Sequence, residues 1–444
     1  MKTGAELANG HSVGAQMHNL VVRLYPTCRS ITGDGVRATL NELQQLVPLE
    51  VHEVPSGTAA FDWTVPKEWN IRDAYVKDST GRRVIDFRMS NLHVVGYSVP
   101  RRITMTLAEL RPHLFSLPDH PDWIPYRTSY YQEDWGFCLS HNQLLSLQDG
   151  NYEVCIDSTL AAGSLTYGEA YLPGQRTDEV LISCHVCHPS LCNDNLSGIA
   201  VSAYLARHLA ALPARRYSYR FLYLPGTIGA ITWLSRHEEQ LDRIRHGFVL
   251  TLVGDAAAST YKQSRRGDAE IDRAFEHVLR HSGKPYAIQK FEPLGYDERQ
   301  FCSPGINLPV GCLMRSPHGK YPEYHSSADD LQHVRPEFLE DSWQKCVAAV
   351  ELLEGNRRYR NLNPKCEPQL GRRGLFRAMG GQPEQAAFER SFLWVLNFSD
   401  SEHSLLDIAE RARLPFSIVR RAADLLLEHG LLEEVRDQPT RSSD

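Results

Sequence analysis

The stretch LISCHVCHPSLCNDNLSGIAV, residues 181–201, joins a short apolar run to a run with helical spacing. Two histidines, three cysteines and an Asp-Asn pair lie between these runs. The first run is short enough to be a buried strand, and the second has the spacing of a helix. A strand, a polar loop and a helix in this order predict a sheet with helices packed on it, in which ligands bind at the carboxyl ends of the strands.

The same alternation continues through residues 151–360. The strand candidates are rich in Val, Ile, Leu, Phe and Tyr, and they read EVLISC, YRFLYLP, GFVLTLVG and LPVGCLM. Segments with helical spacing stand between and after them, for example SGIAVSAYLARHLAAL and PEFLEDSWQKCVAAVELLEG. We therefore expect an α/β domain over residues 151–360, with a mainly parallel sheet flanked by helices on both faces.

The segments on either side of this domain have other patterns. Residues 52–150 are broken by Pro, Gly and Trp and contain a hairpin-like segment around 79–82, which predicts an inserted, mostly β domain. Residues 1–51 supply an amphipathic helix, at about 35–46, that joins the α/β domain. Residues 380–438 read as helix, helix, turn, helix and strand, which is the order of a winged-helix domain.

Composition limits the classes of function. The chain has 444 residues and a formal net charge of -6, and acidic residues outnumber basic ones from Ser399 to its end. This charge argues against nucleic acid as a partner, so we expect the winged-helix-like segment to pack or to bind protein. No apolar run approaches the roughly 18–20 residues that span a bilayer, and the first residues lack the apolar centre of a secretory signal. We expect a cytoplasmic protein whose ten scattered cysteines are reduced, and a homo-oligomer is compatible with the sequence.

The polar loop of the quoted stretch has three chemical interpretations. Cys184 and Cys187 form a CxxC pair, but a redox pair would open a helix, and a structural zinc site would need a second pair of thiols. His185, His188 and Asp194 offer instead the imidazole and carboxylate mixture of catalytic zinc sites, which keep a position open for water. The structural alternative is that Asp194 caps the next helix and the histidines form local hydrogen bonds.

A second polar cluster, PEYHSSADDL at residues 322–331, also follows a predicted strand. It contains His325, and Asp329 or Asp330 is available as a partner that orients an imidazole. Because both loops leave strand ends, they would meet at one edge of the sheet. This second cluster favours a metal site over the structural alternative.

Several longer motifs resemble a bacterial family described as aminopeptidase-like, and they read YPTCRSITGDGVR, PSGTAAFDWTVPKEWNI, NLHVVGYS, IPYRTSYYQEDWGFC, CHPSLCNDNLSG and YHSSADDL. The resemblance covers about residues 15–435. It implies the zinc exopeptidase-like α/β fold of the zinc aminopeptidase superfamily, with an inserted small β domain and a C-terminal winged helix. Members of this family are often labelled polysaccharide-biosynthesis proteins.

The resemblance also implies a set of metal ligands. It makes His185 the first zinc-binding histidine, Asp194 the metal-bridging aspartate and His325 the distal histidine. His188 is a further ligand candidate, supplied by the CHPS pattern of the closer family.

Two carboxylates of the superfamily are missing from this chain. The closer family usually has a glutamate where this chain has Gly226, in the turn after the next strand. A further aspartate ligand is expected near Thr251, which leaves only Asp255 as a shifted substitute. These departures favour a single metal over a full dinuclear site.

Because glycine cannot act as a base in this turn, three acids on strand-end loops remain as catalytic candidates: Asp297, Glu298 and Glu323. The DERQ segment that holds the first two is equally compatible with a solvated loop or an Arg-acid pair. Arg127 and Tyr130 of the inserted domain are candidates for substrate binding, with Arg127 as a bidentate clamp on a carboxylate. The alternative is a hairpin whose aromatic residues only pack a domain interface.

These observations lead to one preferred function and two alternatives. We expect a zinc-dependent, metalloprotease-like hydrolase that holds one or two Zn²⁺ ions. It would cleave an amide or peptide bond of a small aminoacyl or peptide-like substrate, within a biosynthetic pathway. The first alternative is other metal-dependent chemistry, such as cyclisation or deacylation. The second is a catalytically inactive binding or scaffold protein, which the missing glutamate favours.

Overall fold

The computed structural model describes residues 12–375 and 383–435. These residues form two compact units, 12–272 with 285–346 and 273–284 with 347–375 and 383–435. The second unit includes most of the expected winged-helix segment, but positions 380–382 and 436–438 of that segment lie outside the described residues, as do positions 1–11.

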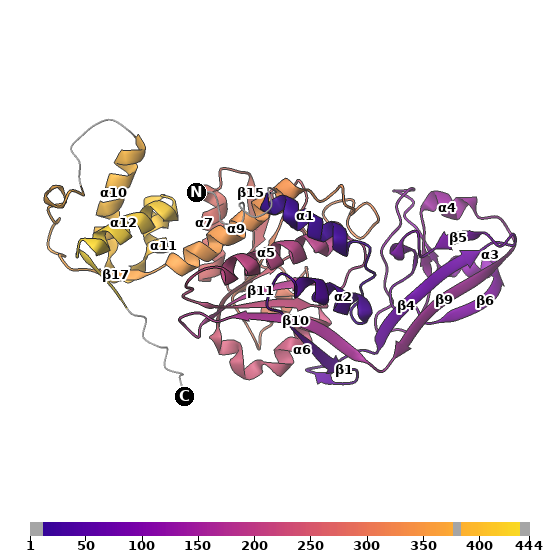
Figure 1. Ribbon diagram of the computed structural model, residues 1–444. Coiled ribbons are helices and arrows are strands. Elements are labelled where there is room, and N and C mark those ends of the chain that lie inside the picture. The colour runs from indigo at the N-terminus through magenta and orange to yellow at the C-terminus, as the bar shows by residue number, and fades with distance from the viewer. Residues whose placement is uncertain (1–11, 376–382, 436–444) are drawn as a thin grey trace. The chain divides into compact units, whose positions relative to one another are not determined.

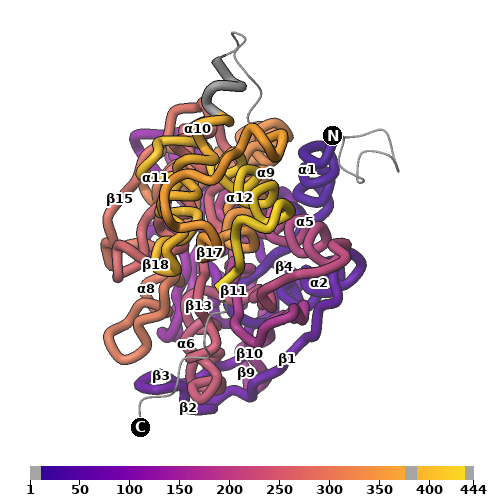
Figure 2. The backbone as a smooth tube through the Cα atoms, turned by 90° about the vertical axis from the view of Figure 1, so that its left-hand side faces the viewer, coloured from indigo at the N-terminus to yellow at the C-terminus, as the bar shows by residue number. Residues whose placement is uncertain are grey.

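The first unit is built around an eight-stranded sheet (Figures 1 and 2). Its strands, in spatial order, are β1 (Glu50–Pro55), β10 (Ser164–Leu172), β12 (Ser218–Leu224), β11 (Glu179–His185), β13 (Ile244–Leu250), β16 (Val310–Met314), β14 (Ser259–Lys262) and β15 (Tyr286–Gln289). The four central strands, from β12 to β16, pair in parallel, as predicted. Antiparallel pairs join β1, β10 and β14 to this centre, and these were not foreseen.

Helices cover both faces of this sheet, which explains why its central strands are continuous apolar runs. Figure 1 shows α1 (Val13–Leu24) and α5 (Gly198–Ala210) on one face, and α6 (Ile228–Arg236) on the other. Every residue of β11, β12 and β16 is buried. The strand ends that carry the polar loops are therefore anchored in the core.

Two further helices belong to this unit. One lies near the N-terminal end of the chain, and the other includes one of the predicted acids. α2 (Asp34–Leu43) begins after Gly33, whose φ of +95° lies in the region that favours glycine. The single-turn helix α8 (Glu298–Phe301) begins inside the DERQ segment, so this segment is not a solvated loop. Both Asp297 and Glu298 are fully buried.

The inserted region forms its own antiparallel sheet, in the order β5 (Arg83–Asp86), β4 (Glu68–Lys77), β9 (Asn151–Ala161) and β6 (Arg101–Thr106). Smaller pairs join β2 (Ala59–Ala60) to β3 (Trp63–Thr64) and β7 (Leu114–Phe115) to β8 (Phe137–Cys138). Short helices α3 (Leu107–Leu110) and α4 (His141–Ser146) connect these strands. Strand pairing crosses the expected boundaries at 52 and 150, because β1 belongs to the main sheet and β9 to the inserted one.

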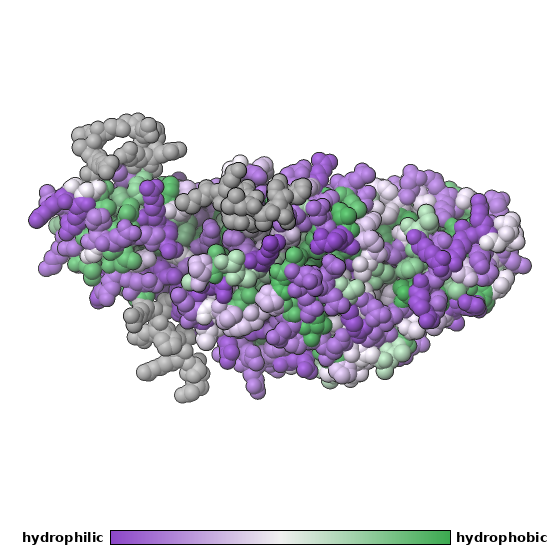
Figure 3. Space-filling view, viewed as in Figure 1, coloured by the Kyte–Doolittle hydropathy of each residue, from purple (hydrophilic) through white to green (hydrophobic). Residues whose placement is uncertain are grey.

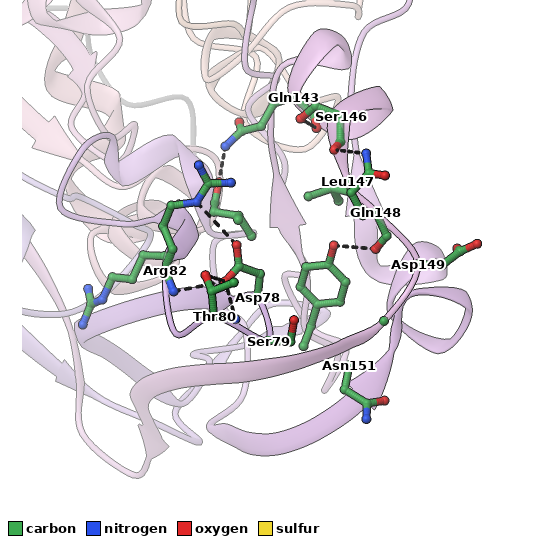
Figure 4. A pocket seen from close by; sticks show the side chains of 14 residues that line it. Asp78, Ser79, Thr80, Arg82, Gln143, Ser146, Leu147, Gln148, Asp149 and Asn151 are labelled. Atoms are coloured by element: carbon green, nitrogen blue, oxygen red, sulfur yellow. Dashed lines mark hydrogen bonds and ion pairs between the residues drawn. The ribbon is translucent and has the colours of Figure 1, made fainter.

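The predicted hairpin turn around 79–82 is present between β4 and β5. The carboxylate of Asp78 accepts hydrogen bonds from the backbone N–H groups of Thr80 and Arg82. A polar cavity of about 400 Å³ opens beside this turn (Figure 4). The turn, α4 and the start of β9 line it, and Tyr152 donates a hydrogen bond to the carbonyl of Gln148 at its edge.

The second unit has the helices and the small sheet of a winged helix. Its helices are α10 (Pro383–Phe398), α11 (Leu405–Ala412) and α12 (Phe416–Glu428), and its sheet has the order β18 (Asp400–Ser404), β17 (Arg358–Asn361), β19 (Leu432–Glu434). Ser404 caps the start of α11, with a reciprocal capping box to Asp407. α7 (Glu270–His281) and α9 (Pro336–Gly355) each supply residues to both units.

The two arginines near the start of α12 have partners within this unit. Arg420 pairs with Asp424 one turn further on, and the Arg421 guanidinium lies over the ring of Phe388. The backbone N–H of Phe416, which opens α12, donates to Nε2 of His277. Both arginines are therefore engaged within this unit, and the packing or protein-binding role expected for the segment stays a prediction.

The surface seen in Figure 3 is mostly hydrophilic, with hydrophobic side chains in small groups. Among the helices of the described residues, none combines the length and apolar character needed to cross a membrane.

Candidate metal centre

The first metal-site loop leaves β11 at His185, so this imidazole stands at the carboxyl end of a buried central strand. The chain then returns, and Nε2 of His185 lies 2.8 Å from Oδ1 of Asp194. The ligand atoms of His185, His188 and Asp194 all lie within 4.8 Å of one another, and all three residues are buried. The structure therefore brings together the three residues that the sequence predicted from this loop.

The second loop adds His325 from the other side of the same carboxylate. Its Nε2 lies 3.0 Å from Oδ2 of Asp194, so each carboxylate oxygen faces a different histidine. Nδ1 of His188 lies 3.8 Å from Oδ1. The His325 side chain is 34% exposed, whereas that of Asp194 is 1% exposed. The cluster is therefore closed on the side of β11 and open beside His325.

Asp329 fixes the backbone of the first loop and does not orient an imidazole. Its carboxylate accepts hydrogen bonds from the backbone N–H groups of Asn193, at 2.5 Å, and Asp194, at 2.9 Å. The expected role of Asp329 or Asp330 as an imidazole partner is therefore wrong, since Asp330 accepts from Gln332 in its own turn. Asp329 thus supports the aspartate ligand through hydrogen bonds to the main chain of the loop.

Electrostatics prepare this cluster for a cation. Burial raises the pKa of Asp194, but His188, His185 and His325 outweigh that effect and hold the pKa well below its usual range. Burial also lowers the pKa of His188 well below its ordinary value, so this imidazole is neutral and keeps a lone pair. A buried carboxylate among imidazoles, with both kinds of ligand atom converging, fits a divalent metal ion.

The neighbouring thiols do not offer thiolate ligands. Burial raises the pKa of the Cys187 thiol to about 12, and its Sγ lies 3.2 Å from the hydroxyl oxygen of Tyr296. Burial also raises the pKa of Cys184. Both cysteines therefore stay protonated, which agrees with the rejection of a redox pair and of a thiolate zinc site.

The structure offers no substitute, among the described residues, for the two carboxylates that are missing at Gly226 and near Thr251. Asp255 accepts a hydrogen bond from Nδ2 of Asn193 at 2.8 Å and supports the loop, so it does not serve as a shifted ligand. Thr251 is buried, and among the described residues its hydroxyl has no hydrogen-bond partner. At Gly226 the space is taken by the ring of Tyr296, which the sequence reasoning missed.

The three predicted acids have different surroundings. Glu298 forms a buried ion pair with Lys262 and accepts a hydrogen bond from the Tyr296 N–H, so its carboxylate is occupied. Glu323 lies on the wall of a surface cavity, and its carbonyl accepts from Ser326. Asp297 is buried, and neither carboxylate oxygen has a partner among the described residues. Burial raises its pKa to about 8.

A loop of the inserted domain reaches the metal cluster through Tyr126. Its backbone N–H donates to the carbonyl of His325 at 2.8 Å, next to an isolated bridge between Pro125 and Ser326. The Tyr126 ring meets the rings of His188 and His325 edge-on, with centroids 5.2 and 5.1 Å apart. The motif IPYRTSYY contained this tyrosine, but its spacing could not single it out.

The two predicted substrate residues lie on the same loop as Tyr126. The hydroxyl of Tyr130 lies 3.1 Å from that of Tyr126, so Tyr130 is one residue removed from the histidines. The Arg127 guanidinium lies over the ring of Phe115 in the inserted domain. Substrate binding by Arg127 and Tyr130 stays a prediction.

Two family models match adjoining parts of the chain, which together span residues 18–434. One is described as a domain of unknown function, DUF4910, and matches residues 18–356, and the other is a winged helix-turn-helix that matches residues 357–434. A protein of Clostridium acetobutylicum, named as a polysaccharide biosynthesis protein with an aminopeptidase-like domain, is 52% identical over 429 residues. That match covers 97% of this chain and 98% of the relative.

Solved structures give the same picture of the fold. A crystal structure from Clostridium acetobutylicum, named as a peptidase, has 52% identity and a TM-score of 0.91, and the match covers 95% of this chain and 96% of that one. The zinc aminopeptidase of Bacillus subtilis has a TM-score of 0.56 at 12% identity, covering 76% and 94%. These matches confirm the predicted fold class, including the C-terminal winged helix.

Proposed function

Since this chain belongs to the DUF4910 family, we propose that this member is a metal-dependent hydrolase of the aminopeptidase-like fold. Its reaction would be cleavage of an amide or peptide bond in a small aminoacyl or peptide-like substrate. The observation that carries the proposal is the shared carboxylate of Asp194, whose two oxygens face Nε2 of His185 and Nε2 of His325. Such an arrangement holds a cation between groups that come from two strand-end loops.

Zinc is the metal that we propose, held by Asp194 with His185, His188 and His325. Imidazole nitrogens and a carboxylate oxygen suit it, and the two cysteines nearby stay protonated. When bound, zinc would supply a Lewis acid that polarises a carbonyl and acidifies water. The exposed edge of His325 marks the side from which a substrate would enter.

Because residue 226 is a glycine, another residue would transfer the proton during hydrolysis. Asp297 is the best supported of the three predicted acids, because neither of its oxygens is occupied and burial raises its pKa to about 8. A carboxyl with a pKa in this range can give and take a proton near neutral pH. Glu298 is held by Lys262, and Glu323 stands at a surface cavity.

The loop of the inserted domain would form the wall of the substrate site. Tyr126 stands edge-on to two of the four ligands, and the hydroxyls of Tyr126 and Tyr130 adjoin each other. Hydroxyl donors and aromatic edges suit a peptide-like substrate with polar groups near the scissile bond. The name of the Clostridium acetobutylicum relative supports a substrate from a biosynthetic pathway.

The test begins with metal content. We expect purified protein to hold close to one zinc per chain by elemental analysis, and His185→Ala to lose it. His403→Ala is the matched control, because His403 also pairs with an aspartate, Asp400, at 2.8 Å, but in the winged-helix unit. A native chain that holds no metal and takes up none from added zinc would overturn the proposal.

Activity is tested next, on a series of aminoacyl amides and short peptides. We expect zinc-dependent hydrolysis that is lost in His185→Ala and falls in Asp297→Asn. One second candidate has its own support: a metal-holding binding protein, favoured by the absence of a carboxylate at Gly226. Full metal content without turnover of any amide, ester or cyclisation substrate would favour that candidate.

A further inference from the structure

We propose that Tyr296 is a positioning residue for the metal ligand His185, and that Tyr296 and Gly226 form a matched pair in which each requires the other. The inference rests on the proposed metal site, but its evidence is the packing around one aromatic ring. The ring lies between the turn after β12 and the imidazole at the end of β11.

The first observation is steric. A Cβ atom placed on Gly226 would lie 1.9 Å from Cε1 of Tyr296, and 2.7 Å from both Cδ1 and Cζ. No side chain tolerates such a contact, and the neighbour here is a partly buried aromatic ring rather than the end of a flexible chain. Even alanine at position 226 would therefore displace the ring.

The second observation is what the ring touches on its other side. The centroids of the Tyr296 and His185 rings are 4.1 Å apart, with the planes tilted by 48°. The His318 ring is nearly parallel to that of Tyr296, with centroids 6.3 Å apart. His185 thus has a fixed aromatic neighbour, which restricts rotation of its imidazole and keeps Nε2 directed at Asp194.

The third observation is how the ring is held. Its hydroxyl donates a hydrogen bond to the carbonyl of Gly226 at 3.1 Å and lies 3.2 Å from Sγ of Cys187. Tyr296 is therefore a hydrogen-bond donor to the turn, which ties the ring to the residue that leaves space for it.

One consequence concerns restoring a carboxylate at position 226. Gly226→Glu in the native background would drive its side chain into the Tyr296 ring, displace the ring from His185 and weaken metal binding. The carboxylate has room only when residue 296 is small. The effect of a side chain at position 226 should therefore depend on the residue at position 296, which a purely local role for either residue would not produce.

The test is a double-substitution cycle on the full-length protein. Zinc affinity is measured by competition with a chelator, and thermal unfolding is followed by circular dichroism. The variants are Gly226→Ala, Tyr296→Ala and their combination, with Tyr296→Phe as the control that keeps the ring and removes the hydroxyl. Tyr296→Leu, which leaves a smaller void, replaces Tyr296→Ala if that variant does not fold.

We expect Tyr296→Ala to weaken zinc binding about 10–100-fold, as loss of a ligand's outer support does, and Tyr296→Phe to change it less than about 3-fold. Gly226→Ala should weaken zinc binding and lower the unfolding temperature in the native background, and do neither in the Tyr296→Ala background. Equal effects of Gly226→Ala in both backgrounds would overturn the matched pair. Unchanged zinc affinity in Tyr296→Ala would overturn the positioning role. If the native chain binds no zinc, the proposed function fails, whereas the unfolding temperatures still decide whether the two residues are matched.

Discussion

The loop after β11 and the turn after β12 leave neighbouring parallel strands at the same edge of the sheet, yet they are built differently. In the loop, Asp194 and the residues beside it are tied to the protein through Asp329, Asp255 and Leu250. In the turn, no side chain exists at Gly226, and a ring from a distant segment fills the space. The loop is thus held by its own network of polar contacts, whereas the turn depends on one aromatic side chain from a distant segment.

Removal of the carboxylate shared by the histidines should have the largest effect on the metal site. Asp194→Asn should weaken zinc binding more than about 100-fold, because the amide is a poor metal ligand and outer partners alone account for 10–100-fold. Asp400→Asn, which changes the partner of His403 in the other unit, serves as the control. Elemental analysis after dialysis measures both. Retention of a full zinc equivalent by Asp194→Asn would contradict the assignment.

Asp329→Asn should loosen the loop after β11 while every proposed ligand stays in place. The carboxylate accepts two backbone N–H bonds from Asn193 and Asp194, and an amide oxygen can accept only part of this set. We expect zinc affinity to fall about 10–100-fold. Asp330→Asn should change it less than about 3-fold, since Asp330 accepts from Gln332 and His333. Equal effects of the two substitutions would count against support through the main chain.

Substitution of Asp297, the residue just before α8, tests whether this carboxyl group transfers the proton. Burial raises its pKa from 3.8 to about 8, so between these pH values the folded chain keeps a proton that the unfolded chain releases. This contribution to stability is present below pH about 4 and is lost as the pH rises to about 8. Asp297→Asn lacks that loss, so its unfolding temperature should exceed the native value by about 2 °C or more at pH 8 and converge with it near pH 4.

Hydrolysis by Asp297→Asn should fall about 10²–10⁴-fold if Asp297 moves the proton. Zinc affinity of the same variant is measured alongside and should stay unchanged. A variant with native activity would return attention to Glu323.

The smallest expected effect lies outside the site. In the second unit Arg273 pairs with both Asp407 and Glu410 of α11, at partly buried positions. Arg273→Ala should lower the free energy of unfolding by about 1 kcal/mol and leave zinc affinity unchanged. Arg280→Ala removes a pair with Glu276 in its own helix and should cost less than about 0.5 kcal/mol. Urea unfolding of both variants measures the difference, and a loss of zinc in either would show coupling that the comparison does not predict.

The parts of the fold that depend on short stretches of sequence, such as apolar runs and helix caps, could be predicted. The buried strands β11, β12, β13 and β16 each carry a continuous apolar run. His185 ends β11, and Asp194 follows it by nine positions. The winged helix has its own start signal at Ser404. The antiparallel outer strands were not foreseen, because pairing between β1 and β10 depends on segments separated by the whole inserted sheet.

The support of the site depends on residues far apart in the chain, and no local pattern reveals such contacts. Tyr296 meets Gly226 across 70 positions, and Asp329 meets Asn193 across 136. The glycine itself was visible in the sequence, but the ring that requires it was not. Glu298 looked like a free acid in DERQ, because its partner Lys262 lies in the distant strand β14.

The hydrogen bond from Tyr126 to the carbonyl of His325 limits how this protein can be shortened by deletion or combined with parts of its relatives. An insertion without contacts to the metal cluster could be exchanged between relatives. It could also be deleted to give a smaller protein with the same cluster. Here the insertion holds the main chain of His325 in the candidate metal cluster, so deleting it would remove a hydrogen bond that fixes this residue. Chimaeras should therefore carry the 124–131 loop and the 322–331 segment together, as one inherited piece.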